Sequence, residues 1–371
     1  VHCGDWAPSD AGRRAARTLL GIAADEIAIL FAGRLSIAGK AHPFQMFDAL
    51  RQVGEQTGRK IVLVQAGQYL NEAIGKIHDD AFAAHAQGVR SIHADGADAD
   101  RYAAAFAGAD IFLSLADNSQ ETFGITPVEA MAAGLPVIVS DWNGYRDTVR
   151  NGVDGFRIHS WAPATGAGER IGLAYEADGD FELYSSRTST TVSVDMVSLV
   201  ARLADLAGDP ALRRRMGEAG RARALADYDW AVVYRAYRAL WAELAAIRQH
   251  AQSDPNTSAW LTDAPRTHAV HQDPFGRFAS YPTEAIDADT LVRAAPHADL
   301  AAYEALIGQR IFALWKMPPD IAAHLIAAAA EPVSVAELAR HIGQGVGVTS
   351  ELVARLAKMN LVTLDPTASI L

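Results

Sequence analysis

Short, continuously apolar segments alternate with amphipathic segments along the first 160 residues of the chain. The apolar runs predict β-strands, and apolar residues spaced three or four positions apart predict helices between them. The expected strands cover residues 26–32, 60–65, 91–93, 110–115 and 135–140, and the expected helices 42–57, 101–107 and 127–133. Strands that are apolar throughout occur in parallel sheets covered by helices on both faces. The pattern therefore predicts an α/β fold with a Rossmann-like doubly wound parallel sheet.

The pattern changes after residue 160. Residues 160–190 are polar, with Gly, Ser and Thr throughout, and predict an inserted loop. Helical spacing returns over residues 195–247. Four aromatic side chains fall on one stripe of the last helix there and are expected to have a packing role: Trp230, Tyr234, Tyr237 and Trp241. Four prolines and several polar residues within 251–285 predict a linker or a wrapping segment.

The last part of the chain has a helical pattern of a different kind. Residues 335–342 and 350–358 predict two helices joined by a glycine-rich turn, and residues 361–364 predict a strand. Helix, turn, helix and strand follow one another in this order in a winged-helix module. We therefore expect an α/β domain over 1–250, a linker over 251–285, and a mainly α-helical, winged-helix-like domain over 286–371.

Composition excludes several classes of function. The net charge of −11 argues against nucleic-acid binding, which usually needs a basic face. The single cysteine excludes an intrachain disulfide and a cysteine zinc site, and it leads us to expect a cytoplasmic protein. No apolar run approaches the roughly 20 residues of a membrane-spanning helix. The 12 histidines show no metal-ligand spacing, so the sequence predicts no metal site.

Two carboxylates, Glu121 and Glu129, flank an aromatic residue, a glycine and a proline on the segment that follows the predicted strand 110–115. Glu121 is expected on the loop at the carboxyl end of that strand, and Glu129 in the first turn of the next helix. Ligands of open α/β sheets bind at this edge, where the free N–H groups of Ile125 and Thr126 would face a phosphate. A carboxylate can accept two hydrogen bonds from a vicinal diol, so the segment predicts a ribose or sugar site. An isolated pair with this spacing is also typical of an acidic helix N-terminus.

A second group of residues follows the first predicted strand directly. Gly33 permits a close turn of the backbone. Arg34 and Lys40 can both reach a diphosphate, the first as a planar fork and the second as a point charge. These residues predict a diphosphate site.

Together, these motifs resemble the retaining nucleotide-sugar glycosyltransferases of the GT-B fold, of the group 1 type, over about residues 1–250. The resemblance rests on Gly33-Arg34-Leu35 with Lys40, on Glu121 and Glu129 with Phe123-Gly124, and on the segment 130–137. It implies that Arg34, Lys40 and Glu121 are catalytic. It implies donor-binding roles for Gly33, Phe123, Gly124, Ile125, Thr126, Glu129, Gly67 and His93.

The resemblance also implies which part of the donor each group would hold. Arg34 and Lys40 would bind the diphosphate and stabilise the leaving group. Glu121 and the backbone of residues 123–124 would hold the donor sugar, and Glu129 the ribose hydroxyls. The nucleobase would lie near the strand ends at residues 67 and 93. The implied small-molecule partner is a nucleoside-diphosphate sugar, which is the donor substrate, and no further cofactor is implied.

Members of this family carry an N-terminal Rossmann-like domain that supplies the acceptor site. Residues 1–5 of this chain resemble the linker that joins the two domains. The resemblance thus implies the C-terminal, donor-binding half of a hexosyltransferase-type enzyme, which would be inactive or weakly active as this chain alone.

Two other functions fit the same residues. One is a non-catalytic nucleotide-sugar-binding or scaffold module whose tail binds a protein partner, and the other is a nucleotide-sugar epimerase on the same fold. Residues 331–371 hold four acidic and three basic residues. We therefore expect this tail to contact a protein partner, to contact a second copy of the chain or to have a packing role, rather than to bind DNA.

Overall fold

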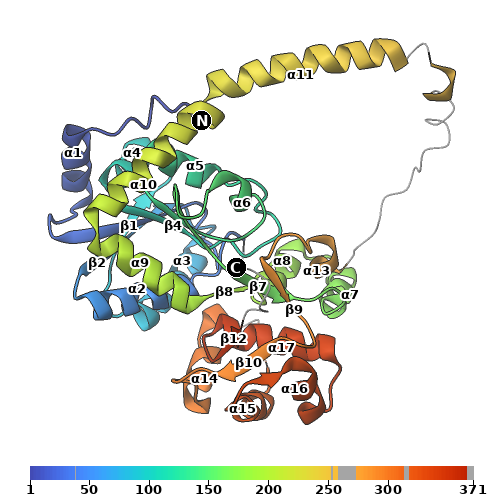
Figure 1. The fold of residues 1–371 in the computed structure, drawn as a ribbon. Coiled ribbons are helices and arrows are strands. Elements are labelled where there is room, and N and C mark those ends of the chain that lie inside the picture. The colour runs from blue at the N-terminus through green and yellow to red at the C-terminus, as the bar shows by residue number, and fades with distance from the viewer. Residues whose placement is uncertain (38, 252–253, 258–272, 313–316, 366–371) are drawn as a thin grey trace.

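The computed structural model describes residues 1–37, 39–251, 254–257, 273–312 and 317–365. Its first part is built on a six-stranded parallel sheet with the strand order β3-β2-β1-β4-β5-β6 (Figure 1). The strands are β1 (Glu26–Ala32), β2 (Lys60–Gly67), β3 (Arg90–Asp95), β4 (Ile111–Ser114), β5 (Val137–Ser140) and β6 (Gly155–Ile158). The order reverses between β1 and β4, which pair directly although β2 and β3 separate them in the sequence. This arrangement confirms the predicted Rossmann-like doubly wound sheet.

Helices cover both faces of this sheet. One hydrophobic cluster receives the apolar faces of α1 (Asp10–Leu20), α4 (Ala99–Gly108) and α5 (Ile125–Ala132). The other receives those of α2 (Phe44–Thr57), α3 (Glu72–His85) and α9 (Met196–Gly208). Side chains of β1 alternate between the two clusters, so that Ile29 joins one and Leu30 the other. Because both faces are covered, polar chemistry is left to the ends of the strands.

The prediction of an inserted loop at residues 160–190 was wrong. The segment contains β7 (Ser160–Pro163), α7 (Glu169–Asp178) and α8 (Phe181–Ser189), and β8 (Ser193–Val194) follows. β7 is the middle strand of a second, three-stranded sheet, between β8 and β9 (Glu284–Ile286). The polar residues form helix because their hydroxyls find partners inside it. Buried Thr188, for example, donates its hydroxyl hydrogen to the Tyr184 carbonyl, with 2.9 Å between the oxygens.

A long helix leaves the α/β domain after α10 (Pro210–Arg223) and a π-helical turn (Ala224–Tyr228). This helix, α11 (Trp230–Ala251), extends away from the rest of the chain (Figure 1). The expectation that its aromatic stripe has a packing role was wrong: Trp230, Tyr234, Tyr237 and Trp241 are 47–55% exposed. Trp241 contacts the rings of Tyr234 and Tyr237, with 5.7 Å between the centroids of Tyr237 and Trp241, and Trp230 contacts the ring of His2. Helical period placed these residues on one face, but it does not determine what covers that face.

A mainly helical C-terminal region follows, as predicted. After α13 (Pro274–Arg277) and β9 it contains β10 (Leu291–Ala294), α14 (Leu300–Ile307), a 3-10 turn (Arg310–Phe312), α15 (Pro319–Ala328), β11 (Val333–Ser334), α16 (Val335–Ile342), α17 (Val346–Lys358) and β12 (Val362–Asp365). β10 pairs in antiparallel fashion with β11 and with β12. Residues 252–253 and 258–272 of the predicted linker lie outside the described residues.

The C-terminal region lies directly against the α/β domain (Figure 1). Asn360 donates its amide hydrogen to Asp48 of α2, with 2.6 Å between nitrogen and oxygen. His85 of α3 and Gln309 are joined by a side-chain hydrogen bond of 2.7 Å. Within the described part of the chain, no helix has the length and apolar character needed to cross a membrane.

We predict that Gly67→Ala destabilises the fold. A Cβ atom at position 67 would lie 1.8 Å from the carbonyl oxygen of Gly33, so β2 and the turn after β1 would have to separate. We expect a loss of about 2 kcal/mol in the free energy of unfolding, measured by urea denaturation. Gly208→Ala is the control, because a Cβ there meets nothing within 4 Å. Equal unfolding midpoints for the two variants would show that the close approach is not a constraint.

Candidate functional site

The candidate site lies at the carboxyl edge of the sheet, next to the reversal between β1 and β4. Gly33 ends β1 with a positive φ of 145°, which favours glycine, and its N–H donates to the Ala66 carbonyl at 2.9 Å. Gly67, at the end of β2, packs against the Gly33 carbonyl. The ring nitrogen Nε2 of His93 lies 2.9 Å from the Gly67 carbonyl oxygen. The fold therefore brings together three residues predicted to bind the donor, from three adjacent strands.

The loop after Gly33 carries the two predicted cations. Arg34 is exposed and donates to the Gly39 carbonyl at 3.3 Å and to the side-chain oxygen of Gln120 at 3.4 Å. The Lys40 ammonium forms an ion pair with the buried carboxylate of Glu121. All three residues predicted to be catalytic thus lie at one place, because the loop after β1 meets the loop between β4 and α5.

Glu121 is held from two further sides. The Tyr145 hydroxyl, at 3.3 Å, donates to the same carboxylate oxygen that binds Lys40. Burial and the nearby Glu121 charge hold the pKa of Tyr145 well above its usual value, so the hydroxyl stays protonated and able to donate. Asn143 donates its amide hydrogen to the Glu121 carbonyl at 2.9 Å. The position of this carboxylate is therefore fixed independently of Lys40.

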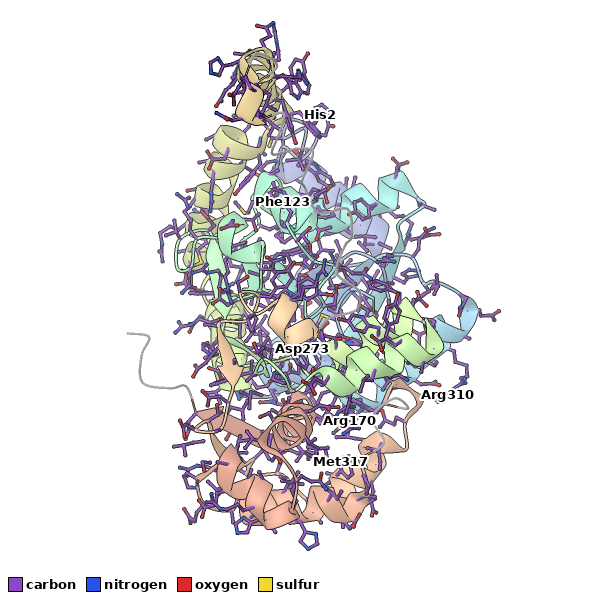
Figure 2. All side chains as sticks on the ribbon, turned by 90° about the vertical axis from the view of Figure 1, so that its right-hand side faces the viewer. His2, Phe123, Arg170, Asp273, Arg310 and Met317 are labelled. Atoms are coloured by element: carbon purple, nitrogen blue, oxygen red, sulfur yellow. The ribbon has the colours of Figure 1, made fainter. Side chains whose placement is uncertain are left out.

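The N-terminus of α5 supplies the remaining predicted donor contacts. Gly124 precedes the helix with a φ of 84° and provides no side-chain cap, and Ile125 is 59% exposed. The first N–H groups of the helix therefore have no capping side chain. Phe123 lies just before them (Figure 2), with 5.9 Å between its ring centroid and that of Tyr228. The buried hydroxyl oxygen of Thr126 has no hydrogen-bond partner among the described residues.

The prediction that Glu129 lies in the first helical turn was wrong. α5 begins at Ile125, so Pro127 occupies its third position and Glu129 falls in the second turn. A proline is tolerated there because the third N–H of a helix has no intrahelical acceptor. Tyr102 donates its hydroxyl hydrogen to Glu129 at 3.4 Å, and burial raises the pKa of the Glu129 carboxyl. Glu121 and Glu129 therefore have different partners in the structure.

Sequence reasoning missed the residues that fix the loops. Asn118 donates its amide hydrogen to the Lys40 carbonyl at 2.5 Å and accepts the N–H of Gln120 at 2.9 Å. The Trp142 indole donates to the Asn118 carbonyl at 2.9 Å. Asn118 could have been found, because it is a polar residue just beyond the end of a predicted strand. Tyr145 follows β5 and had no local signal pointing to Glu121.

A cavity of about 820 Å³ lies away from the candidate site. Its lining includes Trp6, Arg13, Asp110 and Arg213 and contains none of the predicted site residues. Asp110 is at the amino end of β4, at the opposite edge of the sheet from Glu121. Among the described residues, no three His, Cys, Asp or Glu side chains are grouped so that they could hold a metal ion.

Residues 13–171 match the family model described as glycosyl transferases group 1. The alpha-maltose-1-phosphate synthase of Mycobacterium tuberculosis (strain ATCC 25618 / H37Rv) is 30% identical over 113 residues, which are 30% of this chain and 22% of that protein. The D-inositol 3-phosphate glycosyltransferase of Xylanimonas cellulosilytica is 30% identical over 169 residues, which are 43% of this chain and 38% of that protein. The chain thus matches well under half the length of these curated relatives. The structure of Anabaena Alr3699/HepE with UDP and glucose aligns at a TM-score of 0.46 and 17% identity, over 65% of this chain and 55% of that one.

We predict that Glu129→Gln becomes more stable relative to the wild type as the pH rises. Burial raises the folded-state pKa of Glu129, so the folded chain holds the proton more tightly than the unfolded chain. Stability is therefore lost as the pH rises from the unfolded pKa, about 4.3, through the folded one. Glutamine carries no such charge. Urea unfolding at pH 4 and pH 7 measures the difference, with exposed Glu243→Gln as the control. If the wild type instead became more stable relative to Glu129→Gln as the pH rises, burial would not raise the pKa of Glu129.

Proposed function

We propose that this chain, whose residues 13–171 match the family model described as glycosyl transferases group 1, is the donor-binding portion of a glycosyltransferase. It would move a hexosyl group from a nucleoside-diphosphate sugar to an acceptor with retained anomeric configuration. The observation that carries the proposal is the convergence of Arg34, Lys40, Glu121 and the open N-terminus of α5 at one edge of the sheet. Two cations and free helix N–H groups are the donors that a diphosphate prefers.

In this proposal, the ion pair between Lys40 and Glu121 changes partners when the donor binds. The diphosphate attracts the Lys40 ammonium, and the Glu121 carboxylate is then able to accept hydrogen bonds from sugar hydroxyls. Arg34, which is exposed, needs little desolvation to reach the phosphates. Both cations offset the charge that develops on the diphosphate as the sugar leaves. We propose the same roles for the remaining residues as the sequence predicts. Arg34, Lys40 and Glu121 would be catalytic, Glu129 would bind the ribose, and the nucleobase would bind near Gly67 and His93. We also propose that the reaction needs no metal and that the protein is cytoplasmic.

We also propose that the chain needs a further domain for transfer. Two observations support this. Phe123 and Ile125 at the site are 44% and 59% exposed, so the described residues leave the donor site open on one side. The aromatic face of α11 is likewise uncovered by the described residues. The same exposed face favours the second candidate function, a nucleotide-sugar-binding module that docks on a protein partner. No observation favours the epimerase.

We expect isothermal titration calorimetry to detect binding of at least one of UDP, GDP and ADP. Arg34→Ala should weaken that binding about tenfold or more, because hydrogen bonds between charged groups contribute about 1.5–3 kcal/mol. Arg14→Ala is the matched control, since Arg14 is an exposed arginine on α1. If no nucleotide binds at millimolar concentration, or if Arg34→Ala binds like the wild type, the site assignment fails.

We expect the chain alone to transfer little or no sugar. Product analysis would follow donor, with and without candidate acceptors, by chromatography and mass spectrometry. Acceptor-dependent turnover of about 1 s⁻¹ or faster would contradict the need for a further domain. A changed sugar configuration in donor incubated without acceptor would identify an epimerase instead.

A further inference from the structure

A buried ion pair joins the C-terminal region to the candidate site. Lys358 is the last residue of α17, and its ammonium nitrogen lies 2.5 Å from a carboxylate oxygen of Asp117. Both side chains are only 3% exposed. Burying an ammonium and a carboxylate is costly unless each compensates the other. Removal of either partner would leave an uncompensated charge out of water.

Asp117 is close to the site in sequence and in space. It lies between β4 and Glu121, on the loop that carries the predicted carboxylate. The oxygen that binds Lys358 also accepts the backbone N–H of His42 at 2.9 Å. His42 ends the loop that starts at Gly33 and carries both predicted cations. One carboxylate oxygen therefore connects Lys358 to the loop of Arg34 and Lys40.

The neighbouring groups offer Asp117 little other compensation. Its second carboxylate oxygen has no hydrogen-bond partner in the described ranges of the chain. Burial, followed by the charge of Lys358, keeps the pKa of His42 well below its usual value, so that ring stays neutral. Asn118 follows Asp117 and donates its amide hydrogen to the Lys40 carbonyl. Movement of Asp117 would therefore disturb the cation-bearing loop at His42 and at Lys40.

We propose that Lys358 is a positioning residue for the diphosphate site: it compensates Asp117 and thereby fixes residues 39–42, the described end of the loop that carries Lys40. This inference rests on the proposed function, because the loop matters for catalysis only if it binds the donor. It gives the C-terminal region a definite task. The region forms part of the support of the donor site, and it does so through a residue far outside the 13–171 segment that matches the family.

Lys358 could also stabilise the interface between the C-terminal region and the α/β domain, and a control variant separates this effect from the positioning of the loop. Asn360 is buried at the same interface, where it donates to Asp48 and accepts from Gln45, two residues of α2 that are not part of the loop after Gly33. Its φ of 59° suits glycine, so Asn360→Gly removes both bonds without straining the backbone. Asn360→Gly is therefore the matched control for Lys358→Met.

The experiment measures nucleotide affinity, amide hydrogen exchange and thermal unfolding for the wild type and three variants of the full chain. UDP, GDP and ADP are the probes. We expect Lys358→Met to weaken binding at least tenfold and to speed exchange in peptides covering residues 35–43. Asn360→Gly should leave both unchanged. The double variant Asp117→Asn with Lys358→Met should bind within threefold of the wild type, because a neutral amide oxygen can still accept the His42 N–H.

Each outcome decides the proposal. Lys358→Met with wild-type affinity and exchange overturns it, and so does an equal loss in Asn360→Gly. If the wild type binds no nucleotide, the proposed function fails, and exchange alone decides whether Lys358 holds the loop. If Lys358→Met does not fold, the double variant decides. A folded double variant with intact binding and exchange supports action through Asp117, and one that has lost them overturns it.

Discussion

A lysine ammonium and an aspartate carboxylate meet almost wholly out of water where the two parts of this chain join. Such a pair persists only if its geometry is kept, since either charge alone would be expensive to bury. The ion pair between Asp117 and Lys358 constrains both parts of the chain. Through Lys358 it holds the end of α17 and hence the C-terminal region, and through Asp117 it holds the loop between β4 and α5 and the N–H of His42. This pair thus links the candidate site to the C-terminal region.

The sheet explains why the polar residues gather where they do. Helices cover both faces, so only the strand ends can carry exposed chemistry, and all parallel strands end at one edge. Close backbone contact between Gly33 and Gly67 lets the loop after β1 bend across that edge. There the Lys40 ammonium meets Glu121, whose position Tyr145 and Asn143 also fix. In the proposed function, this arrangement keeps a cation and a carboxylate in place until a diphosphate sugar separates them.

Much of the fold and part of the candidate site could be predicted from the sequence. β1 at 26–32 was predicted to the residue, because its apolar run has a sharp glycine stop, and both α16 and the doubly wound sheet follow from period and alternation. Residues 160–190 misled because Ser and Thr were taken as loop residues, whereas their hydroxyls bond helix carbonyls. The aromatic face of α11 has the right period but no cover among the described residues. The pair of Asp117 and Lys358, 241 positions apart, has no local signal, because only the tertiary fold brings its partners together.

A crystal structure of the chain with the nucleoside diphosphate that binds most tightly tests the central claim most directly. We expect the diphosphate to lie between Arg34, Lys40 and the N-terminus of α5, with the Lys358 ammonium still paired with Asp117. Nucleotide bound elsewhere, such as in the 820 Å³ cavity beside Arg13 and Arg213, would contradict it. So would a diphosphate in the expected place with Lys358 displaced from Asp117.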